Sequence, residues 1–218
     1  FVLSCQGMVS SPTAAQRKTR ADGERTRALI LDTAVRLATI EGLDGLSIGK
    51  LAGETGVSKS GLYAHFGSKE QLQLATVETA RHLFIEQVVA PALQATGLER
   101  LQALCESFLR YVERRTLPGG CFFAAAAAEL GSRPGPVREL IAENQEDWTG
   151  LLTETAEDAI SAGQLRRETD VAVLVFGLNA LVVAANTAFI LHENPAVIDR
   201  ARAAVTRVLA ADAPGADQ

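Results

Sequence analysis

The segment from residue 47 to residue 69 constrains the fold of this chain more than any other, because it reads as two short helices joined by a tight turn. Ser47 is a favourable N-cap for the first helix, and Ser58 is one for the second. Gly56 lies between them and can adopt the positive φ with which a helix ends and the chain turns sharply. The second helix carries small, basic and hydroxyl-bearing residues on its outer face, namely Lys59, Ser60, Tyr63 and Ala64, with His65 at the margin. This pattern predicts a helix-turn-helix, whose second helix reads DNA in the major groove.

These residues resemble the DNA-binding domain of the tetracycline-repressor-like (TetR) transcription regulators. The resemblance covers about a quarter of the chain without gaps and is carried by Arg27 to Leu37, Glu41-Gly42, Ser47, Leu51-Ala52, Gly56 to Ser58, Leu62-Tyr63, His65-Phe66 and Gly67 to Leu72. A second stretch resembles the ligand domain of one branch of that family, through Gly119 to Phe123, Ala124 to Glu129 and Pro134 to Arg138. The resemblance implies a regulator, in most cases a repressor, that binds a palindromic operator in double-stranded DNA and is released by a small effector.

Matching positions in the family contact bases and phosphates, which gives an expected role to each exposed residue of the helix-turn-helix. Lys59 and Ser60 are assigned to the groove, where base contacts specify the site. Tyr63 and His65 are assigned to phosphate oxygens, which position the protein on the duplex.

Three further residues are expected to hold phosphate at helix starts. Ser47 lies at a helix N-terminus, where its hydroxyl and the free backbone amides can bind an anion. Lys69 offers a second clamp at the start of the next helix, and Ser58 belongs to the same surface. For Ser47 and Ser58 the alternative is capping alone, and the two roles can coexist.

Charge is distributed unevenly along the chain, whose net charge is -5. Residues 8–81 carry ten Lys or Arg against eight Asp or Glu, whereas residues 82–218 carry eleven Arg against eighteen Asp or Glu. Local charge determines which surface meets phosphate, so the asymmetry predicts two functional modules.

The 218 residues are enough for two modest domains. Residues 1–7 precede the only methionine, Met8, and are expected to be an upstream extension without the features of a secretion signal. The N-terminal segment up to residue 21 is expected to be a flexible basic arm. Its Arg17, Lys18 and Arg20 can enter the minor groove or remain solvated. The expected divisions are a flexible basic arm at 1–21, a helix-turn-helix domain at 22–68, an effector-binding and dimerisation domain at 69–210, and a tail at 211–218.

Apolar periodicity predicts an all-α fold of about nine helices without a strand. Pro91 marks a break in the helix that begins at Ser68. Besides the helix-turn-helix, helices are expected over 25–40, from 68 onward, and over 97–116, 121–130, 135–162, 170–191 and 195–209.

Helix 170–191 is apolar on nearly every side and must therefore be covered all round. A symmetric partner could cover it, and the resemblance implies a homodimer joined by a four-helix bundle. We expect residues 136–162 and 170–191 to form an isologous interface. The alternative is a helix that is simply central in the monomer.

The C-terminal domain is expected to hold an apolar or amphipathic effector in a pocket lined mostly by apolar side chains. Asn179 and Asn186 are candidates for the few polar groups, or they could fix the register of a dimer. Ordinary core packing is the alternative for the aromatic residues. The candidate lining residues are Phe108, Tyr111, Cys121, Phe122, Trp148 and Asn179.

Cys121 follows two glycines at a predicted helix start, where the local field favours the thiolate. A thiol-based redox-sensing regulator is therefore an alternative function. A cysteine-dependent enzyme is a more distant one, because His82 and His192 sit in no recognisable motif that would supply a base. The sequence accordingly predicts a protein that is not an enzyme.

Metal, cofactor and membrane binding are not expected. The three cysteines form no C-x-x-C pair, and the three histidines show no i,i+4 spacing. The longest apolar run, residues 171–191, is interrupted by Asn179, Asn186 and Thr187, which favours a buried helix over a membrane span. A cytoplasmic location is expected.

Overall fold

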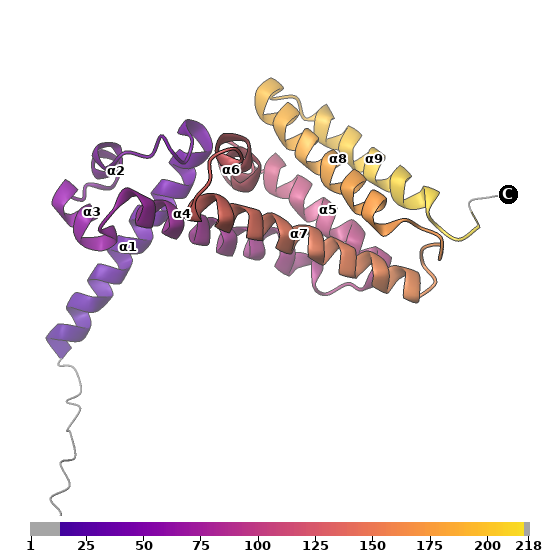
Figure 1. Ribbon diagram of the computed structural model, residues 1–218, viewed down its shortest axis with the longest axis horizontal. Helices are drawn as coiled ribbons and strands as arrows, with labels where there is room; N and C mark the ends of the chain where they lie inside the picture. The colour runs from indigo at the N-terminus through magenta and orange to yellow at the C-terminus, as the bar shows by residue number, and fades with distance from the viewer. Residues whose placement is uncertain (1–13, 216–218) are drawn as a thin grey trace, which may run out of the picture.

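The computed structural model describes residues 14–215, and their side chains from residue 21 on. Within that part the chain forms nine α-helices and no strand, so the predicted all-α class is confirmed (Figure 1). A small head at one end contains α1 (Ala14–Glu41), α2 (Ile48–Thr55), α3 (Lys59–Phe66) and the start of α4 (Lys69–Phe84). The larger helical domain contains α5 (Gly97–Glu113), α6 (Phe122–Leu130), α7 (Pro136–Ser161), α8 (Val171–His192) and α9 (Ala196–Ala211).

The helix-turn-helix forms as its local signals predict. The Ser47 hydroxyl accepts a hydrogen bond from the backbone N–H of Lys50, and the Ser58 hydroxyl accepts one from that of Gly61, both at 3.1 Å. Gly56 ends α2 with φ 68°, in the left-handed region that favours glycine. The apolar sides of the two helices are buried through Leu51, Leu62 and Phe66.

Helix α1 begins at Ala14, whereas the sequence predicted a flexible arm to residue 21 and a helix from Arg25. The segment after Pro12 is rich in alanine, glutamine, arginine and lysine, which are good helix formers, and this propensity extends the helix toward the N-terminus. The side chains of Arg17, Lys18 and Arg20 lie outside the described part of the structure. So do residues 1–13, including Cys5 and Met8, and residues 216–218 of the tail.

Helix α4 connects the head to the larger domain and leaves α geometry ahead of Pro91, close to the predicted break. A π-helical turn spans Ile85–Val89, and the backbone N–H of Ala90 donates to the Ile85 carbonyl. A 3₁₀ turn, Ala90–Ala92, follows. Pro91 has no N–H and its ring excludes a regular α turn before it, which explains the change of helix type.

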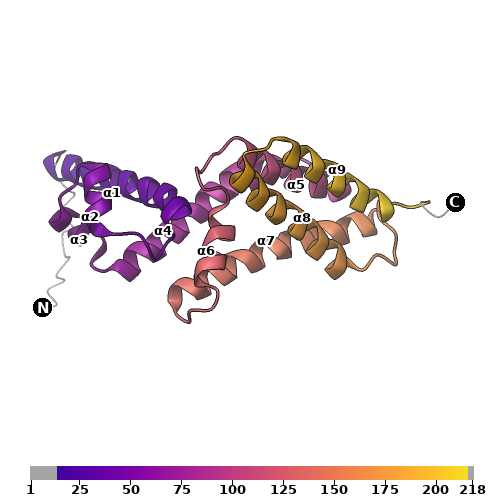
Figure 2. The ribbon, with the colours of Figure 1, turned by 90° about the horizontal axis from the view of Figure 1, so that it is seen from above.

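Helix α5 is the central helix of the larger domain and packs against α7, α8 and α9. Its buried side includes Leu101, Leu104, Phe108 and Val112. Helices α8 and α9 lie side by side as an antiparallel pair, and Figure 2 shows them from above. Arg202 of α9 is held to α5 by Glu106 and Glu113, with its guanidinium nitrogens 2.9 and 2.7 Å from their carboxylate oxygens.

By length and composition, α8 is the one helix of the described chain that could cross a membrane. Its interruption by asparagine and threonine therefore does not by itself exclude a span. One face of α8 packs against α5, α7 and α9, while the opposite face is exposed. Leu178 and Val182 are fully buried in this contact, and Asn186 is buried with its side-chain oxygen hydrogen-bonded.

The loop before α6 approaches the head so closely that only glycine fits. The N–H of Gly119 donates to the Thr39 hydroxyl at 3.1 Å. A Cβ added at Gly119 would overlap the Thr39 carbonyl group of α1. The backbone of this loop thus rests directly on the end of α1.

Replacing Gly119 by Ala is expected to destabilise the fold by about 1–3 kcal/mol, because the added methyl group forces the loop off α1. Thermal unfolding followed by circular dichroism should show a Tm lowered by several degrees. Gly150→Ala in α7 is the matched control, since a Cβ there meets nothing within 4 Å. The control should unfold at or slightly above the wild-type Tm. A Gly119→Ala protein as stable as the control would contradict the close contact.

Candidate functional site

The outer face of α3 presents a continuous polar surface. Lys59, Ser60 and Tyr63 are exposed, and they lie together because residues three or four apart share a helix face. Gly61 and Ala64 add no bulk between them. His65 is half-buried beside the Phe66 ring, so it stands at the edge of this surface.

Ser47 and Ser58 serve as helix caps, which was the structural alternative for both. In each cap the hydroxyl oxygen accepts a backbone N–H, so the hydroxyl proton is not used by the cap. The Ser58 oxygen also lies 3.1 Å from that of Ser60. The Ser47 hydroxyl retains its proton as a donor for an anion at the start of α2.

The lysines of the head differ in what they contact. Lys69 lies 2.6 Å from the Asp44 carbonyl oxygen and 3.1 Å from its carboxylate, and Lys50 pairs with Glu41. Asp44 also accepts from Arg133 at 2.7 Å, and these two partners, Lys69 first, lower the pKa of its carboxyl group. Lys59 has no carboxylate partner among the described residues. Among the three lysines with described side chains, it is therefore the one whose charge is fully available to an anion.

A cavity of about 330 Å³ lies in the larger domain between α4, α6, α7 and α8. Its wall includes four aromatic side chains, Phe84, Phe108, Phe123 and Trp148. The ring of Phe84 contacts its neighbours edge to face, with a centroid separation of 5.4 Å to Trp148 and 6.0 Å to Phe123. Edge-to-face pairs at these distances stabilise a fixed ring arrangement. The lining also includes Ile85 and Val89 from the π turn, so this unusual backbone shapes the wall.

Four of the six sequence-predicted pocket residues line this cavity, namely Phe108, Cys121, Trp148 and Asn179. The other two predictions need correction. Tyr111 is buried against the edge of Phe84 and lies outside the lining, and Phe122 is buried while its neighbour Phe123 takes the lining position.

The residues that sequence reasoning missed come mainly from α4 and α7. Phe84 and Arg81 lie on the half of α4 that follows the head, where the sequence pattern was read only as a helix approaching a break. Asn144, Gln145 and Asp147 precede Trp148 on α7. The signal that could have found them is helical spacing, since Asn144 and Trp148 are four residues apart on one face.

The two asparagines of α8 have different structural roles. The Asn179 oxygen accepts a hydrogen bond from the Trp148 indole N–H at 3.0 Å, at the cavity wall. The Asn186 oxygen accepts from the backbone N–H of Cys121 at 2.8 Å and lies against Gly120, which has φ 83°. Asn186 therefore fixes the start of α6 and does not line the cavity.

The prediction of a reactive thiolate at Cys121 is not supported by its surroundings. Backbone N–H groups of Phe123 and Ala124 lower the pKa of this thiol, but burial outweighs them and raises it to about 11. Burial likewise raises the pKa of Cys105, to about 12. Both thiols are therefore protonated near neutral pH, which counts against the redox-sensor alternative and against a cysteine nucleophile. Across residues 14–215, no three His, Cys, Asp or Glu side chains group as a metal site would require.

Helix α6 touches both the cavity and the head. Cys121, Phe123, Ala124 and Ala127 line the cavity. Near the other end of the helix, the Glu129 carboxylate accepts hydrogen bonds from the backbone N–H groups of Leu43 at 2.6 Å and Asp44 at 3.0 Å. One short helix thus connects the cavity wall to the α1–α2 loop of the head.

Comparison with known proteins places both halves of the chain in one family. The family described as "Bacterial regulatory proteins, tetR family" matches residues 30–76, and "Tetracyclin repressor-like, C-terminal domain" matches residues 97–205. The HTH-type transcriptional regulator LmrA of Bacillus subtilis (strain 168) is 27% identical over 184 residues, which are 80% of this chain and 95% of LmrA.

Solved structures of other proteins have the same fold. A TetR transcriptional regulator from Chloroflexus aurantiacus J-10-FL superimposes with a TM-score of 0.80 at 26% identity, over 88% of this chain and 96% of that one. AibR, solved in complex with isovaleryl coenzyme A and operator DNA, superimposes with a TM-score of 0.67 at 24% identity, over 87% of this chain and 98% of its own.

The burial of Cys121 and Cys105 predicts that both thiols resist alkylation in the folded protein. In a Cys5→Ser background at pH 8, iodoacetamide should modify them at least about a hundredfold more slowly than free cysteine, because only a small fraction is thiolate. Intact-mass spectrometry over time measures this, and the same protein in denaturant should be alkylated fully. Rapid modification of Cys121 in the folded protein would restore the redox-sensor reading.

Proposed function

Because this chain belongs to the TetR family of DNA-binding transcriptional regulators, we propose that it is a homodimeric repressor released from its operator by a small apolar or amphipathic effector. The observation that carries the proposal is that α4 and α6 each contribute to the cavity wall and also contact the head. The effector cavity and the DNA-binding head are thereby linked through two helices. As an operator-binding regulator it acts in the cytoplasm, and the proposal assigns it no catalytic step.

On this proposal α3 enters the major groove. Lys59, which has no carboxylate partner among the described residues, and Ser60 reach base edges. Tyr63, Lys69 and the Ser47 hydroxyl hold phosphates. Lys69 must exchange Asp44 for a phosphate when DNA binds. His65 is half-buried and is assigned to the margin of the contact.

Substitutions on the head should separate base contacts from phosphate contacts. Lys59→Ala and Ser60→Ala are expected to change the preferred operator sequence, whereas Lys69→Ala should weaken binding to all sequences and reduce the salt slope by about one. Fluorescence anisotropy at several salt concentrations measures both effects. Arg110→Ala, which removes a positive charge from α5, is the control and should bind like wild type. The α3 assignment fails if Lys59→Ala and Ser60→Ala leave affinity and sequence preference untouched.

The outer face of α8 supports dimerisation. Val173, Phe176 and Leu191 are 67%, 76% and 72% exposed, an unusual degree for large apolar side chains. Between them the stripe continues through small residues at spacings of three or four, Ala180, Ala184 and Thr187. This is the spacing of a helix seam that packs against a second helix.

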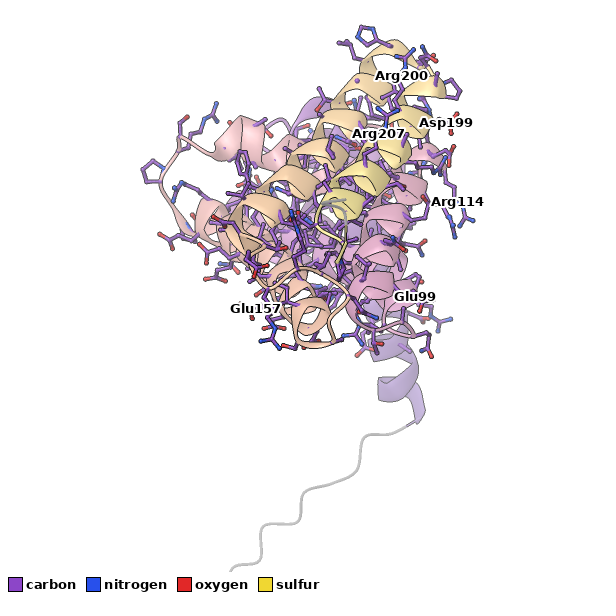
Figure 3. All side chains as sticks on the ribbon, turned by 90° about the vertical axis from the view of Figure 1, so that its right-hand side faces the viewer. Glu99, Arg114, Glu157, Asp199, Arg200 and Arg207 are labelled. Carbon is purple, nitrogen blue, oxygen red and sulfur yellow. The ribbon has the colours of Figure 1, made fainter. Side chains whose placement is uncertain are left out.

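Charge favours α9 over α7 as the second helix of this interface, which revises the expectation for residues 136–162. The exposed face of α7 carries seven acidic residues, Glu139, Glu143, Glu146, Asp147, Glu154, Glu157 and Asp158. Two such faces across a two-fold axis would repel. The exposed face of α9 is mixed and includes Ala203 and Ala210 with Arg200 and Arg207. Figure 3 shows Glu157 on the opposite side of the bundle from Arg200.

Replacing Phe176 by Asp should convert the dimer into a monomer, because the substitution places two unpaired charges in a symmetric apolar interface. Analytical ultracentrifugation at micromolar concentration measures the change. Leu93→Asp is the control, since Leu93 is an exposed apolar residue away from α8. A wild-type protein that sediments as a monomer would refute the dimer. A Phe176→Asp protein that remains dimeric would refute this interface.

Effector control follows if the ligand binds one arrangement of the two heads better than the other. The coupling is reciprocal, so operator DNA must weaken the binding of such a ligand by the same factor. A thermal-shift screen of hydrophobic metabolites, followed by operator gel shifts with each stabilising compound, tests the proposal. If every stabilising compound left operator affinity unchanged, effector control would be wrong even though the protein bound DNA.

A further inference from the structure

The cavity wall contains one ion pair in otherwise apolar and amide surroundings. Arg81 of α4 donates to the Asp147 carboxylate of α7 at 2.6 Å. Both residues belong to the lining, and no other fully charged side chain does. The pair therefore determines which charge a ligand can carry into the cavity.

The two side chains differ in how well water can solvate each of them once its partner is lost. The Arg81 side chain is 39% exposed, whereas that of Asp147 is 60% exposed. A cationic ligand that took Asp147 would leave Arg81, the less hydrated partner, without a counter-charge. An anionic ligand that took Arg81 would leave Asp147, which water already reaches. Because the less hydrated of two charges costs more free energy when it is left unpaired, the exchange favours an anionic ligand.

A second group of the wall has unused donors. The indole N–H of Trp148 can only donate, so its bond fixes the Asn179 oxygen as the acceptor. The side-chain amino group of Asn179 therefore does not contact Trp148, and its two N–H donors make no hydrogen bond with any described residue. Asn144 and Gln145 carry both donors and acceptors and do not discriminate between charges. The guanidinium fork of Arg81 matches a carboxylate in a bidentate geometry.

We propose that the cavity binds a small amphipathic carboxylate, whose aromatic or branched apolar body packs against the contacting rings of Phe84, Phe108 and Trp148 in the cavity wall and whose carboxylate replaces Asp147 on Arg81. The volume lies at the lower end of the range for small-molecule sites, which suits a body of one or two rings. The proposal deepens the effector function described above and rests on it only for the consequence at the operator.

The exchange has a mechanical consequence. Arg81 lies on the helix that begins in the head at Lys69, and Asp147 lies on α7. Their ion pair connects α4 to α7 near the end of α4 that lies farther from the head. A ligand that captures Arg81 removes this link and replaces it with a contact to itself, so α4 is free to take a different position relative to α7.

Three matched probes test the ligand class: naphthylacetate, naphthylacetamide and naphthylethylammonium, which share an apolar body and differ in charge. Binding is measured by isothermal titration calorimetry on the full chain without DNA. We expect the carboxylate to bind at least about tenfold more tightly than the amide, as a charge-assisted pair with arginine implies. The ammonium probe should bind no better than the amide. A triplet built on cyclohexyl bodies repeats the comparison for a smaller ligand.

Variants assign the preference to the ion pair. Arg81→Gln should abolish the difference between carboxylate and amide, whereas Asp147→Asn should tighten the carboxylate, because the competing group is gone. Arg110→Gln, which breaks an exposed ion pair with Glu106 away from the cavity, should leave all three affinities unchanged. Circular dichroism confirms that each variant is folded.

The binding data test the ligand class of the cavity separately from the proposed repressor function. Tightest binding by the ammonium probe, weakened by Asp147→Asn, would assign the cavity to cations and overturn the proposal. So would the absence of carboxylate binding up to the solubility of both triplets. Operator binding is measured separately by anisotropy. Carboxylate binding without any operator affinity would refute the repressor function and leave the ligand class standing.

Discussion

The position of the DNA-reading head depends on a small set of backbone contacts at the two ends of α6. Glu129 accepts from two backbone amides of the α1–α2 loop, and Gly119 rests on the last turn of α1. Backbone amides of a fixed loop cannot rotate to new partners as side chains can, so these contacts define an orientation as well as an attachment. Asp44, in the same loop, pairs with Arg133 from beyond α6 and with Lys69 of the head.

The larger domain is built so that a ligand meets the same two helices. Phe84 and the π turn belong to α4 and its continuation, while Cys121 and Phe123 begin α6. When a molecule enters a close-packed interior, the surrounding helices shift between discrete packing arrangements and do not deform continuously. On the proposed function, a ligand in the cavity moves these walls as units, and both of them contact the head.

Local chemistry explains why the helix-turn-helix could be predicted residue by residue. The caps at Ser47 and Ser58 and the turn at Gly56 depend on neighbours within four positions, and the sequence contains all of them. The start of α1 was missed because the basic, polar segment before Arg25 suits a solvated arm as well as a helix. The charge of Cys121 was misjudged for a different reason: the helix start was predicted, but its burial is decided by the packing of α6 against other helices.

The cavity was predictable only in part, because its contacts join distant segments. Phe122 and Phe123 are adjacent and similar, and which ring faces the cavity depends on how α6 rotates against α7. Arg81 and Asp147 are 66 residues apart, and Glu129 lies 86 residues from Leu43. Neither contact can be inferred from helical periodicity, because its two residues lie on different segments of the chain. Such contacts became visible only when the helices were placed in space.

Trp148 is the sole tryptophan of the chain, and it stands in the cavity wall with its indole N–H bonded to Asn179 of α8. The molecule therefore carries an intrinsic optical probe at the point where the ligand space, α7 and the helix of the proposed dimer seam meet. A change in the polarity around this ring shifts its emission, and loss of the bond to Asn179 alters it further. Native fluorescence can thus follow events in the cavity in unlabelled protein, free of background from any other indole.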